Sequence, residues 1–190
     1  VSNWFLTNGL LVNPSKSDSN FIGTYQRTNL IDNSSVTMDG ISIPLSKTVK
    51  SLGVVLDQQM TFEIHVKNIC RICNYHIKSL RSLRPSLDTD TAETIGRSIV
   101  MSKLDYCNSL LVHTSQRNLH RLQMVQNNLA RLVSGSDYRQ SIKPVLTVLH
   151  WLPIELRIDY KIISLTFKSR INLLPDYLSN KLTVFTSTRP

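Results

Sequence analysis

The sequence predicts an α+β fold, with a small antiparallel sheet near the N-terminus followed by a mainly α-helical bundle. Two patterns and one charge asymmetry lead to this prediction. Short strand-like segments separated by turn signals fill the first 57 residues. After Asp57, apolar residues recur at steps of three and four, the spacing of one face of an α-helix. The excess of basic residues begins at nearly the same place.

The N-terminal segments are predicted as the end of a helix and three strands. The helix covers residues 4–12, and Asn13-Pro14 ends it because proline disfavours helical geometry in the residue before it. Strands are predicted over residues 20–25, 36–43 and 49–56. Asp39-Gly40 lies inside the second strand segment and predicts a two-residue hairpin turn, since both central positions of such a turn need positive φ.

The first long helix is predicted from Phe62 to the residues before Pro85, which ends it. Its apolar face consists of Val66, Ile69, Cys73, Ile77, Leu80 and Leu83. Four basic residues fall within about 80° of one another on the opposite face, counting 100° per residue. They are Lys67, Arg71, Lys78 and Arg81. The pattern indicates an amphipathic helix with a basic outer stripe.

Two further helices precede residue 135. Asp88 or Thr89 is the predicted N-cap of a helix that runs to about Lys103. The next helix covers residues 116–133, and Gly135 is a suitable C-terminal stop. Its apolar face consists of Leu119, Leu122, Gln126, Leu129 and Val133. Its outer face carries Arg117, Arg121 and Arg131.

The last long helix is predicted over residues 154–171, after a short break at His150 to Pro153. Pro153 suits a first helical turn, where its missing N–H costs nothing, and Glu155 lies at the positive end of the helix dipole. Trp151 is expected to anchor the start of this helix on the core. The helix presents two stripes. Basic residues Arg157, Lys161 and Lys168 form one, and Leu156, Tyr160, Ile163 and Phe167 form the other.

The net charge of +9 is concentrated after residue 60. Of the 22 basic and 13 acidic residues, 18 and 9 lie there, whereas the first sixty residues are balanced. A basic region that repeats the same stripe on three helices favours a polyanion partner, with nucleic acid as the first candidate. The alternative is a solubilising surface that binds nothing.

Membrane and secreted classes are not predicted. No apolar run approaches the roughly 20 residues that cross a bilayer, and the N-terminus has no basic leader. The three cysteines are an odd number, which favours reduced thiols in an intracellular, cytoplasmic or nuclear setting.

The sequence contains none of the common motifs of enzymes that act on their own. Cys70 and Cys73 have C-x-x-C spacing, but they lie in mid-helix without a second Cys/His pair, so packing is favoured over zinc. The five histidines are scattered, and no phosphate-binding loop, nucleophile elbow or H-E-x-x-H occurs. The acidic residues are separated along the chain, so no metal site is predicted.

Ordered motifs give the chain a family resemblance. Read in order, WFLTNGLLVNPSKSD, VKSLGVVLD, LDYCNSLL, LHRLQMVQNNLARLV, LHWLPIELRIDYKI and LPDYL resemble the C-terminal part of the reverse transcriptase of non-LTR (LINE-type) retrotransposons. The resemblance covers nearly the whole chain. It implies that residues 1–57 are the end of the polymerase palm and that residues 58–190 are a helical thumb with its extension.

The resemblance also implies roles for individual residues. Lys16 matches a lysine that is a candidate proton donor to departing pyrophosphate, although an ordinary loop lysine is an equal alternative. Leu52 and Gly53 match a primer-grip turn, for which a core strand is the alternative. The basic helices would hold an RNA–DNA primer-template hybrid by its backbone, reading shape and not base edges. His150 to Pro153 match a hinge between two helices of the thumb extension.

The departures from the family are equally informative. The catalytic aspartates, including a Tyr/Phe-x-Asp-Asp hairpin, are not present in this sequence. Mg²⁺ is therefore implied for the intact polymerase only, and the chain alone is expected to be an inactive fragment without fingers, most of the palm or an endonuclease domain. Two alternatives remain open: a basic helical nucleic-acid-binding module, or a protein-docking module, without polymerase ancestry.

Overall fold

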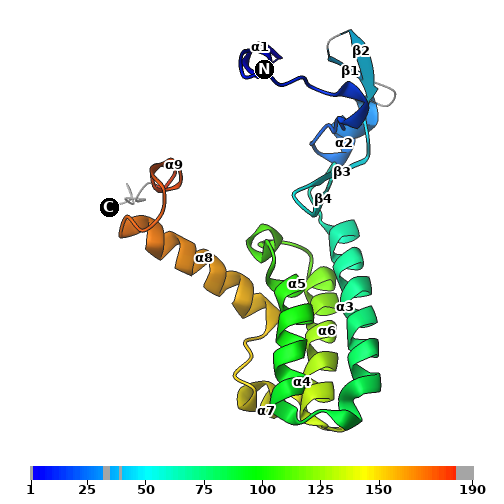
Figure 1. The fold of residues 1–190 in the computed structure, drawn as a ribbon, viewed down its shortest axis with the longest axis vertical. Helices are drawn as coiled ribbons and strands as arrows, with labels where there is room; N and C mark the ends of the chain where they lie inside the picture. The colour runs from blue at the N-terminus through cyan, green and yellow to red at the C-terminus, as the bar shows by residue number, and fades with distance from the viewer. Residues whose placement is uncertain (1, 32–34, 39, 183–190) are drawn as a thin grey trace. The chain divides into compact units, whose positions relative to one another are not determined.

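The computed structural model describes residues 2–31, 35–38 and 40–182, and it forms two compact units, Val1–Lys67 and Asn68–Pro190 (Figure 1). Short helices and two small antiparallel sheets come first, and helices follow. The predicted α+β class is therefore confirmed. The assignment of residues 1–57 to a palm and of 58–190 to a thumb stays a prediction.

The first unit consists of short elements. Its helices and 3-10 turns are α1 (Ser2–Thr7), Pro14–Lys16, α2 (Tyr25–Thr28) and Asn29–Ile31. Its strands are β1 (Ser35–Met38), β2 (Ile41–Pro44), β3 (Thr48–Ser51) and β4 (Val54–Asp57). The strand predicted over residues 20–25 is wrong, because residues 20–24 form no strand and α2 begins at Tyr25; a bridge between Ser19 and Leu45 precedes them. The N-terminal helix is also shorter than predicted, and Gly9 follows it with φ +68°.

The two hairpins have tight turns. β1 and β2 pair antiparallel, with Met38 opposite Ile41, as Asp39-Gly40 predicted; Gly40 has φ +79°, and Asp39 lies outside the described residues. The single strand predicted over residues 49–56 is wrong. Leu52 and Gly53 have φ of 46° and 86°, which reverses the chain and splits the segment into β3 and β4. The turn that the family resemblance implied is thus present.

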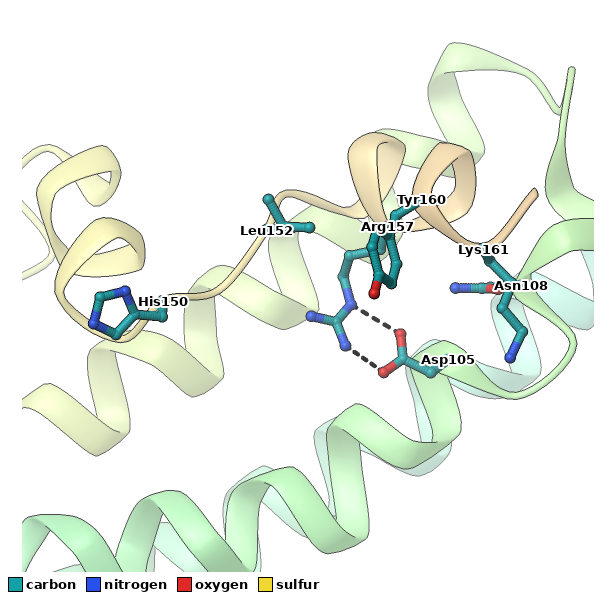
Figure 2. Close-up of a pocket in the computed structure, with 7 residues that line it drawn as sticks. All are labelled: Asp105, Asn108, His150, Leu152, Arg157, Tyr160 and Lys161. Carbon is teal, nitrogen blue, oxygen red and sulfur yellow. Dashed lines mark hydrogen bonds and ion pairs between the residues drawn. The ribbon is translucent and has the colours of Figure 1, made fainter. Parts of the chain in front are cut away.

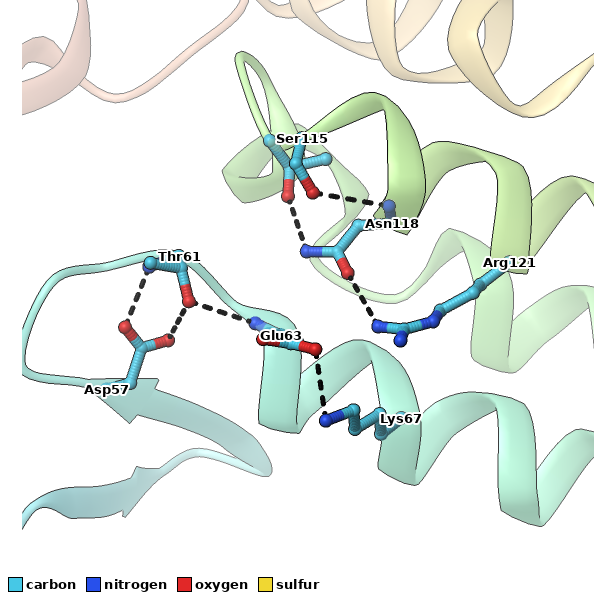
Figure 3. Close-up of polar contacts among 8 residues, drawn as sticks. Asp57, Thr61, Glu63, Lys67, Ser115, Asn118 and Arg121 are labelled. Carbon is cyan, nitrogen blue, oxygen red and sulfur yellow. Dashed lines mark hydrogen bonds and ion pairs between the residues drawn. The ribbon is translucent and has the colours of Figure 1, made fainter.

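Asp57 connects β4 to the start of helix α3 (Glu63–Leu83). Its buried carboxylate accepts hydrogen bonds from the backbone N–H of Thr61 at 2.8 Å and of Phe62 at 2.7 Å, and from the Thr61 hydroxyl at 3.1 Å (Figure 3). These groups lie at the positive end of the helix dipole, where an anion is stabilised. One turn later, Nδ1 of buried His65 accepts the Val55 N–H at 3.3 Å.

The second unit is helical and begins within α3. Its other elements are the 3-10 turn Arg84–Ser86, α4 (Thr89–Gly96), a π-helical segment (Arg97–Met101), α5 (Ser102–Asp105), the 3-10 turn Asn108–Leu111, α6 (Gln116–Ser134), α7 (Ile142–Val148), α8 (Ile154–Arg170) and α9 (Asp176–Ser179). The predicted helix up to about Lys103 is present as α4, the π-helical segment and α5 in unbroken succession. The helix predicted over residues 116–133 is confirmed as α6.

The caps follow the predicted residue types. Asp88 is the N-cap of α4, and its carboxylate accepts the Thr91 N–H at 2.7 Å. Hydrogen bonds from Thr91 lower the pKa of the Asp88 carboxyl. Ser115 caps α6 in the same way, and Gly135 ends α6 with φ +70°. The ends predicted for the long helices after residue 60 are therefore right to within one or two residues.

The core of the second unit lies between α3, α4 and α6, which run side by side in Figure 1. Fully buried residues there are Cys73, Leu80, Val100, Leu122, Leu129 and Val133. Gly96 lies close to α6, because a Cβ at this position would be 2.9 Å from Cδ1 of Leu129. A side chain at this position would require Leu129 to move.

Trp151 is the anchor that the sequence predicted. It is buried, and its indole Nε1–H donates to Oε1 of Glu93 at 3.1 Å. Pro153 immediately precedes α8 and does not belong to its first turn. None of the helices among the described residues combines the length and hydrophobicity needed to span a membrane.

Helix α8 buries a different face from the one that its apolar stripe suggests. Ile154 and Ile158 are buried. The stripe itself is 51–66% exposed, and its members are Leu156, Tyr160, Ile163 and Phe167. The shared design of an apolar inner face and a basic outer face therefore holds for α3, except that Leu83 at its end is 57% exposed, and it does not hold for α8. In α6 the inner face is buried, but only Arg117 of the predicted outer arginines is exposed.

Candidate nucleic-acid interface

Helix α3 displays its basic stripe to solvent. Lys67, Arg71, Lys78 and Arg81 are all exposed, while Val66, Cys73, Ile77 and Leu80 on the opposite face are buried. Lys67 forms an ion pair with Glu63 at 3.0 Å. Over the ranges that the structure describes, no carboxylate lies within ion-pair distance of Arg71, Lys78 or Arg81. Three cations of this helix are thus available to an external anion.

The arginines of α6 differ in their surroundings. Arg117 is exposed. Arg121 is half-buried and donates to Oδ1 of Asn118 at 3.3 Å, while the Asn118 side-chain amide donates to the Thr114 hydroxyl at 3.0 Å (Figure 3). Arg131 donates to the carbonyl oxygens of Asp137 at 2.8 Å and Gln140 at 3.1 Å. The first arginine faces solvent, and the third holds the loop that follows α6.

The three basic residues of α8 are also not equivalent. Nε of Arg157 donates to Oδ1 of Asp105 at 2.8 Å, and its Nη2 donates to Oδ2, so the pair is bidentate (Figure 2). Much of the Arg157 charge is therefore compensated within the chain. Lys161 and Lys168 are exposed, and among the described residues neither has a carboxylate partner.

A pocket of about 270 Å³ lies beside this ion pair. It is lined by Asp105, Asn108, His150, Leu152, Arg157, Tyr160 and Lys161 (Figure 2). Asn108 is only 5% exposed, and its Oδ1 has no hydrogen-bond partner in the part of the chain described. Sequence reasoning missed Asp105 and Asn108, because Arg157, the partner of Asp105, lies 52 residues away along the chain.

The N-terminal candidates occupy two different turns. Lys16 is exposed in the 3-10 turn Pro14–Lys16. Leu52 and Gly53 form the tip of the β3–β4 hairpin, where the Leu52 side chain is 88% exposed. The turn itself is exposed, whereas strands β3 and β4 flank it and Val54 is buried. The role of each residue remains a prediction.

The C-x-x-C pair is part of the helix packing. Cys73 is fully buried, with Sγ 3.9 Å from the Val100 carbonyl oxygen, and burial raises the pKa of this thiol to about 12. Burial also raises the pKa of Cys70, against the opposing effect of Arg121. Among the described residues, no group of three His, Cys, Asp or Glu side chains could hold a metal ion.

Arg84 is a structural residue that sequence reasoning missed. Its guanidinium donates to the carbonyl oxygens of Leu132 at 3.0 Å and Val133 at 2.9 Å, in the last turn of α6, and to the Leu87 carbonyl oxygen at 2.7 Å. It thereby satisfies carbonyls that a helix end leaves without intrahelical partners. A basic residue beside Pro85 was the available signal, but its partners lie 48 and 49 residues away.

Comparison with known proteins found a relevant sequence similarity. No protein-family model matches the chain, and no solved structure matches it. Over 142 residues, 72% of this chain, it is 26% identical to the "Probable RNA-directed DNA polymerase from transposon X-element" of Drosophila melanogaster. The matched stretch is 15% of that protein's length. The chain is therefore similar to a limited, reverse-transcriptase-like region of a transposon polymerase.

Proposed function

We propose that this chain is the end of the palm and the thumb of a non-LTR retrotransposon RNA-directed DNA polymerase, and that it holds primer-template nucleic acid by its backbone. The similarity to the X-element polymerase supports a reverse-transcriptase origin. Because the matched stretch is a small part of that protein, the polymerase activity and its RNA and DNA substrates are part of the proposal.

The basic stripe of α3 is the observation that carries the binding function. Arg71, Lys78 and Arg81 lie on the exposed face of a helix whose other face is buried. Cations without a carboxylate partner retain their full attraction for phosphate, and each contact releases counterions from the nucleic acid. Such contacts position a duplex without reading its sequence. This is the behaviour required of a surface that must accept every template.

Chemistry is assigned to residues outside this chain. The proposal places the metal-binding aspartates in another part of the polymerase, and among the described residues no group of three His, Cys, Asp or Glu side chains could hold a metal ion. Leu52 and Gly53 would contact the primer end through their exposed turn, and Lys16 would supply a proton to pyrophosphate. The chain alone is predicted to incorporate no nucleotides.

Fluorescence anisotropy with a labelled RNA–DNA hybrid, measured across a salt series, tests the proposal. The test variant replaces Lys67, Arg71, Lys78 and Arg81 by alanine. The matched control replaces four other exposed basic residues, Arg27, Lys47, Arg139 and Lys143, which removes the same charge from other elements. The stripe variant should bind more weakly, and the slope of log affinity against log salt should fall by roughly one for each phosphate that is no longer neutralised.

The control separates a specific surface from a general charge effect. If the control variant weakens binding as much as the stripe variant, net charge and not α3 governs association. If the unchanged chain shows no salt-dependent binding, the nucleic-acid function is wrong and the stripe is only a solvated face.

A further inference from the structure

Helix α8 presents an apolar face to solvent. Its members, the α8 stripe, are Leu156, Tyr160, Ile163 and Phe167, which are 51%, 65%, 66% and 61% exposed. Single exposed apolar residues are common on protein surfaces, but a continuous row of large ones marks an interaction site. The row is therefore expected to have an occupant.

The other side of α8 makes the contacts of this helix within its own unit. Ile154 and Ile158 are buried there. Ile162, Leu165 and Ser169 line an apolar pocket together with leucines of the segment that contains α9, which follows α8 in Figure 1. Counting 100° per residue, all five lie on the side of the helix opposite the α8 stripe. The contacts within the unit thus leave the stripe accessible.

The spacing of the α8 stripe is that of a coiled-coil seam. Steps of four, three and four residues alternate along it, as the a and d positions of a heptad do. When two copies pair antiparallel about a two-fold axis midway along the seam, Leu156 lies opposite Phe167 of the second copy, and Tyr160 lies opposite Ile163. Each layer then holds one aromatic and one aliphatic side chain, which fills the seam evenly. A parallel pair would instead place two phenylalanines in one layer and two tyrosines in another.

The charges beside the stripe favour the same antiparallel pairing. By the count of 100° per residue, Glu155, Asp159 and Arg170 lie along one edge of the stripe, with the two acids near the start of α8 and the arginine at its end. All three are exposed, and over the described ranges none of them forms an ion pair. Antiparallel pairing brings Arg170 of each copy beside Glu155 of the other. A parallel pair would bring like charges together.

The area of the stripe is sufficient for a reversible dimer. An aromatic side chain alone can bury roughly 150–250 Å², so the four exposed side chains offer on the order of 500 Å² per copy. The pair would then bury about 1,000 Å² in total, near the lower limit of specific interfaces. An interface of this size is expected to have a dissociation constant on the order of 10 μM.

We propose that a second copy of this chain covers the α8 stripe, in a two-fold symmetric dimer of antiparallel α8 helices. Such an interface uses one surface twice and must be complementary to itself, as the layers and the charge pairs here are. The proposal concerns the assembly of the chain and does not depend on its proposed function.

The dimer would also join the basic surfaces of two α8 helices. Lys161 and Lys168 lie along the other edge of the stripe and are exposed. The two-fold axis is perpendicular to both helices, so this edge faces the same side in each copy. The second copy thereby doubles the cations available to one nucleic acid, and this consequence rests on the proposed function.

Sedimentation equilibrium of the whole chain tests the dimer at roughly 1–200 μM, a range that brackets the expected dissociation constant. The unchanged chain should show a reversible equilibrium between monomer and dimer. Ile163→Glu should leave only monomer, because it would place two charges in the middle of the seam. Tyr75→Glu is the matched control, since Tyr75 is 69% exposed on α3, and it should leave the dimer unchanged.

A charge exchange tests the orientation of the two helices. Glu155→Arg and Arg170→Glu should each weaken the dimer roughly tenfold, because each places like charges together at both ends of the seam. The double variant restores opposite charges at both ends and should dimerise as the unchanged chain does. In a parallel pair or a non-specific aggregate, the two single changes would not compensate each other.

Three results would overturn the proposal. These are a monomer at every concentration, a dimer that survives Ile163→Glu, and a double variant no tighter than the single variants. Each of them leaves salt-dependent hybrid binding by α3, and hence the proposed function, intact. A chain that dimerises as described but does not bind the hybrid would instead overturn the proposed function and leave the dimer standing.

Discussion

Single residues connect segments that are distant in sequence. Arg84 reaches the last turn of α6, Trp151 reaches Glu93, and Arg157 reaches Asp105. The capping roles of Asp88 and Gly135 were predictable, because a cap depends on residues within the same turn. The contacts of Arg84, Asp105 and Asn108 were not, because they depend on how the helices pack.

Replacing Arg84 should destabilise the second unit. Arg84→Ala removes the donors for Leu132 and Val133, and we expect the free energy of unfolding to fall by about 2 kcal/mol. Urea denaturation followed by circular dichroism measures the change. Arg81→Ala, at an exposed arginine nearby, is the control and should change stability by less than about 0.5 kcal/mol. Equal effects of the two substitutions would show that the helix-end contacts contribute nothing.

His65 should make the first unit sensitive to pH. Burial lowers the pKa of His65 below the usual 6.5, so the unfolded chain takes up a proton at a higher pH than the folded chain. The stability present above pH 6.5 is therefore lost as the pH falls through that value towards the lower folded pKa. A protonated Nδ1 also cannot accept the Val55 N–H.

Hydrogen exchange of the Val55 amide measures this effect locally. On lowering the pH from about 7.5 to about 5.5, its protection should fall more in the unchanged chain than in His65→Gln, whose side chain accepts a hydrogen bond but does not titrate. The same loss of protection in both proteins would exclude His65 as the cause.

At the scale of elements, apolar periodicity predicted α3 and α6 correctly because each packs one face against neighbouring helices. It did not predict which face of α8 is buried, since Ile154 and Ile158 are buried and the regular apolar stripe that begins at Leu156 is exposed. It also could not show that residues 49–56 form two strands. The β-branched residues there fit one strand, and the positive φ of Leu52 is a property of the folded turn.

Gly96 tests how closely α4 and α6 must pack. Alanine favours a helix interior by roughly 1 kcal/mol over glycine, but the new Cβ would lie 2.9 Å from Leu129. We expect the overpacking to prevail, so Gly96→Ala should lower stability by about 1–2 kcal/mol. Thermal denaturation measures this loss of stability, with Thr94→Ala on the exposed face of α4 as the control. Adding Leu129→Ala should reduce the penalty of Gly96→Ala, and strict additivity of the two changes would contradict the steric explanation.

For the molecule as a whole, composition and motif order predicted more than local patterns did. The α+β class and the position of the sheets followed from the sequence. The order of the motifs predicted a resemblance to a retrotransposon polymerase, and the chain is similar in part to the X-element protein. The pocket beside Arg157 did not follow, because its lining residues come from two motifs, LDYCNSLL and LHWLPIELRIDYKI, and the sequence does not show that these motifs meet in the fold. Charge predicted a basic surface, but only packing shows which cations, such as Arg131 and Arg157, are held by the chain itself.

The π-helical segment Arg97–Met101 joins α4 and α5 into one continuous helix, and it affects how that helix tolerates a change in length. In an uninterrupted α-helix, Leu104 would lie about 120° around the axis from Ala92. The π-helical turn contains about one residue more than an α-helical turn, which offsets about 100° of the rotation between Ala92 and Leu104. Both side chains therefore face the interior, where both are buried. Deleting one residue here would convert the segment to regular α-helix and leave both flanks in phase. Related chains that are one residue shorter at this point are therefore expected to keep the same core.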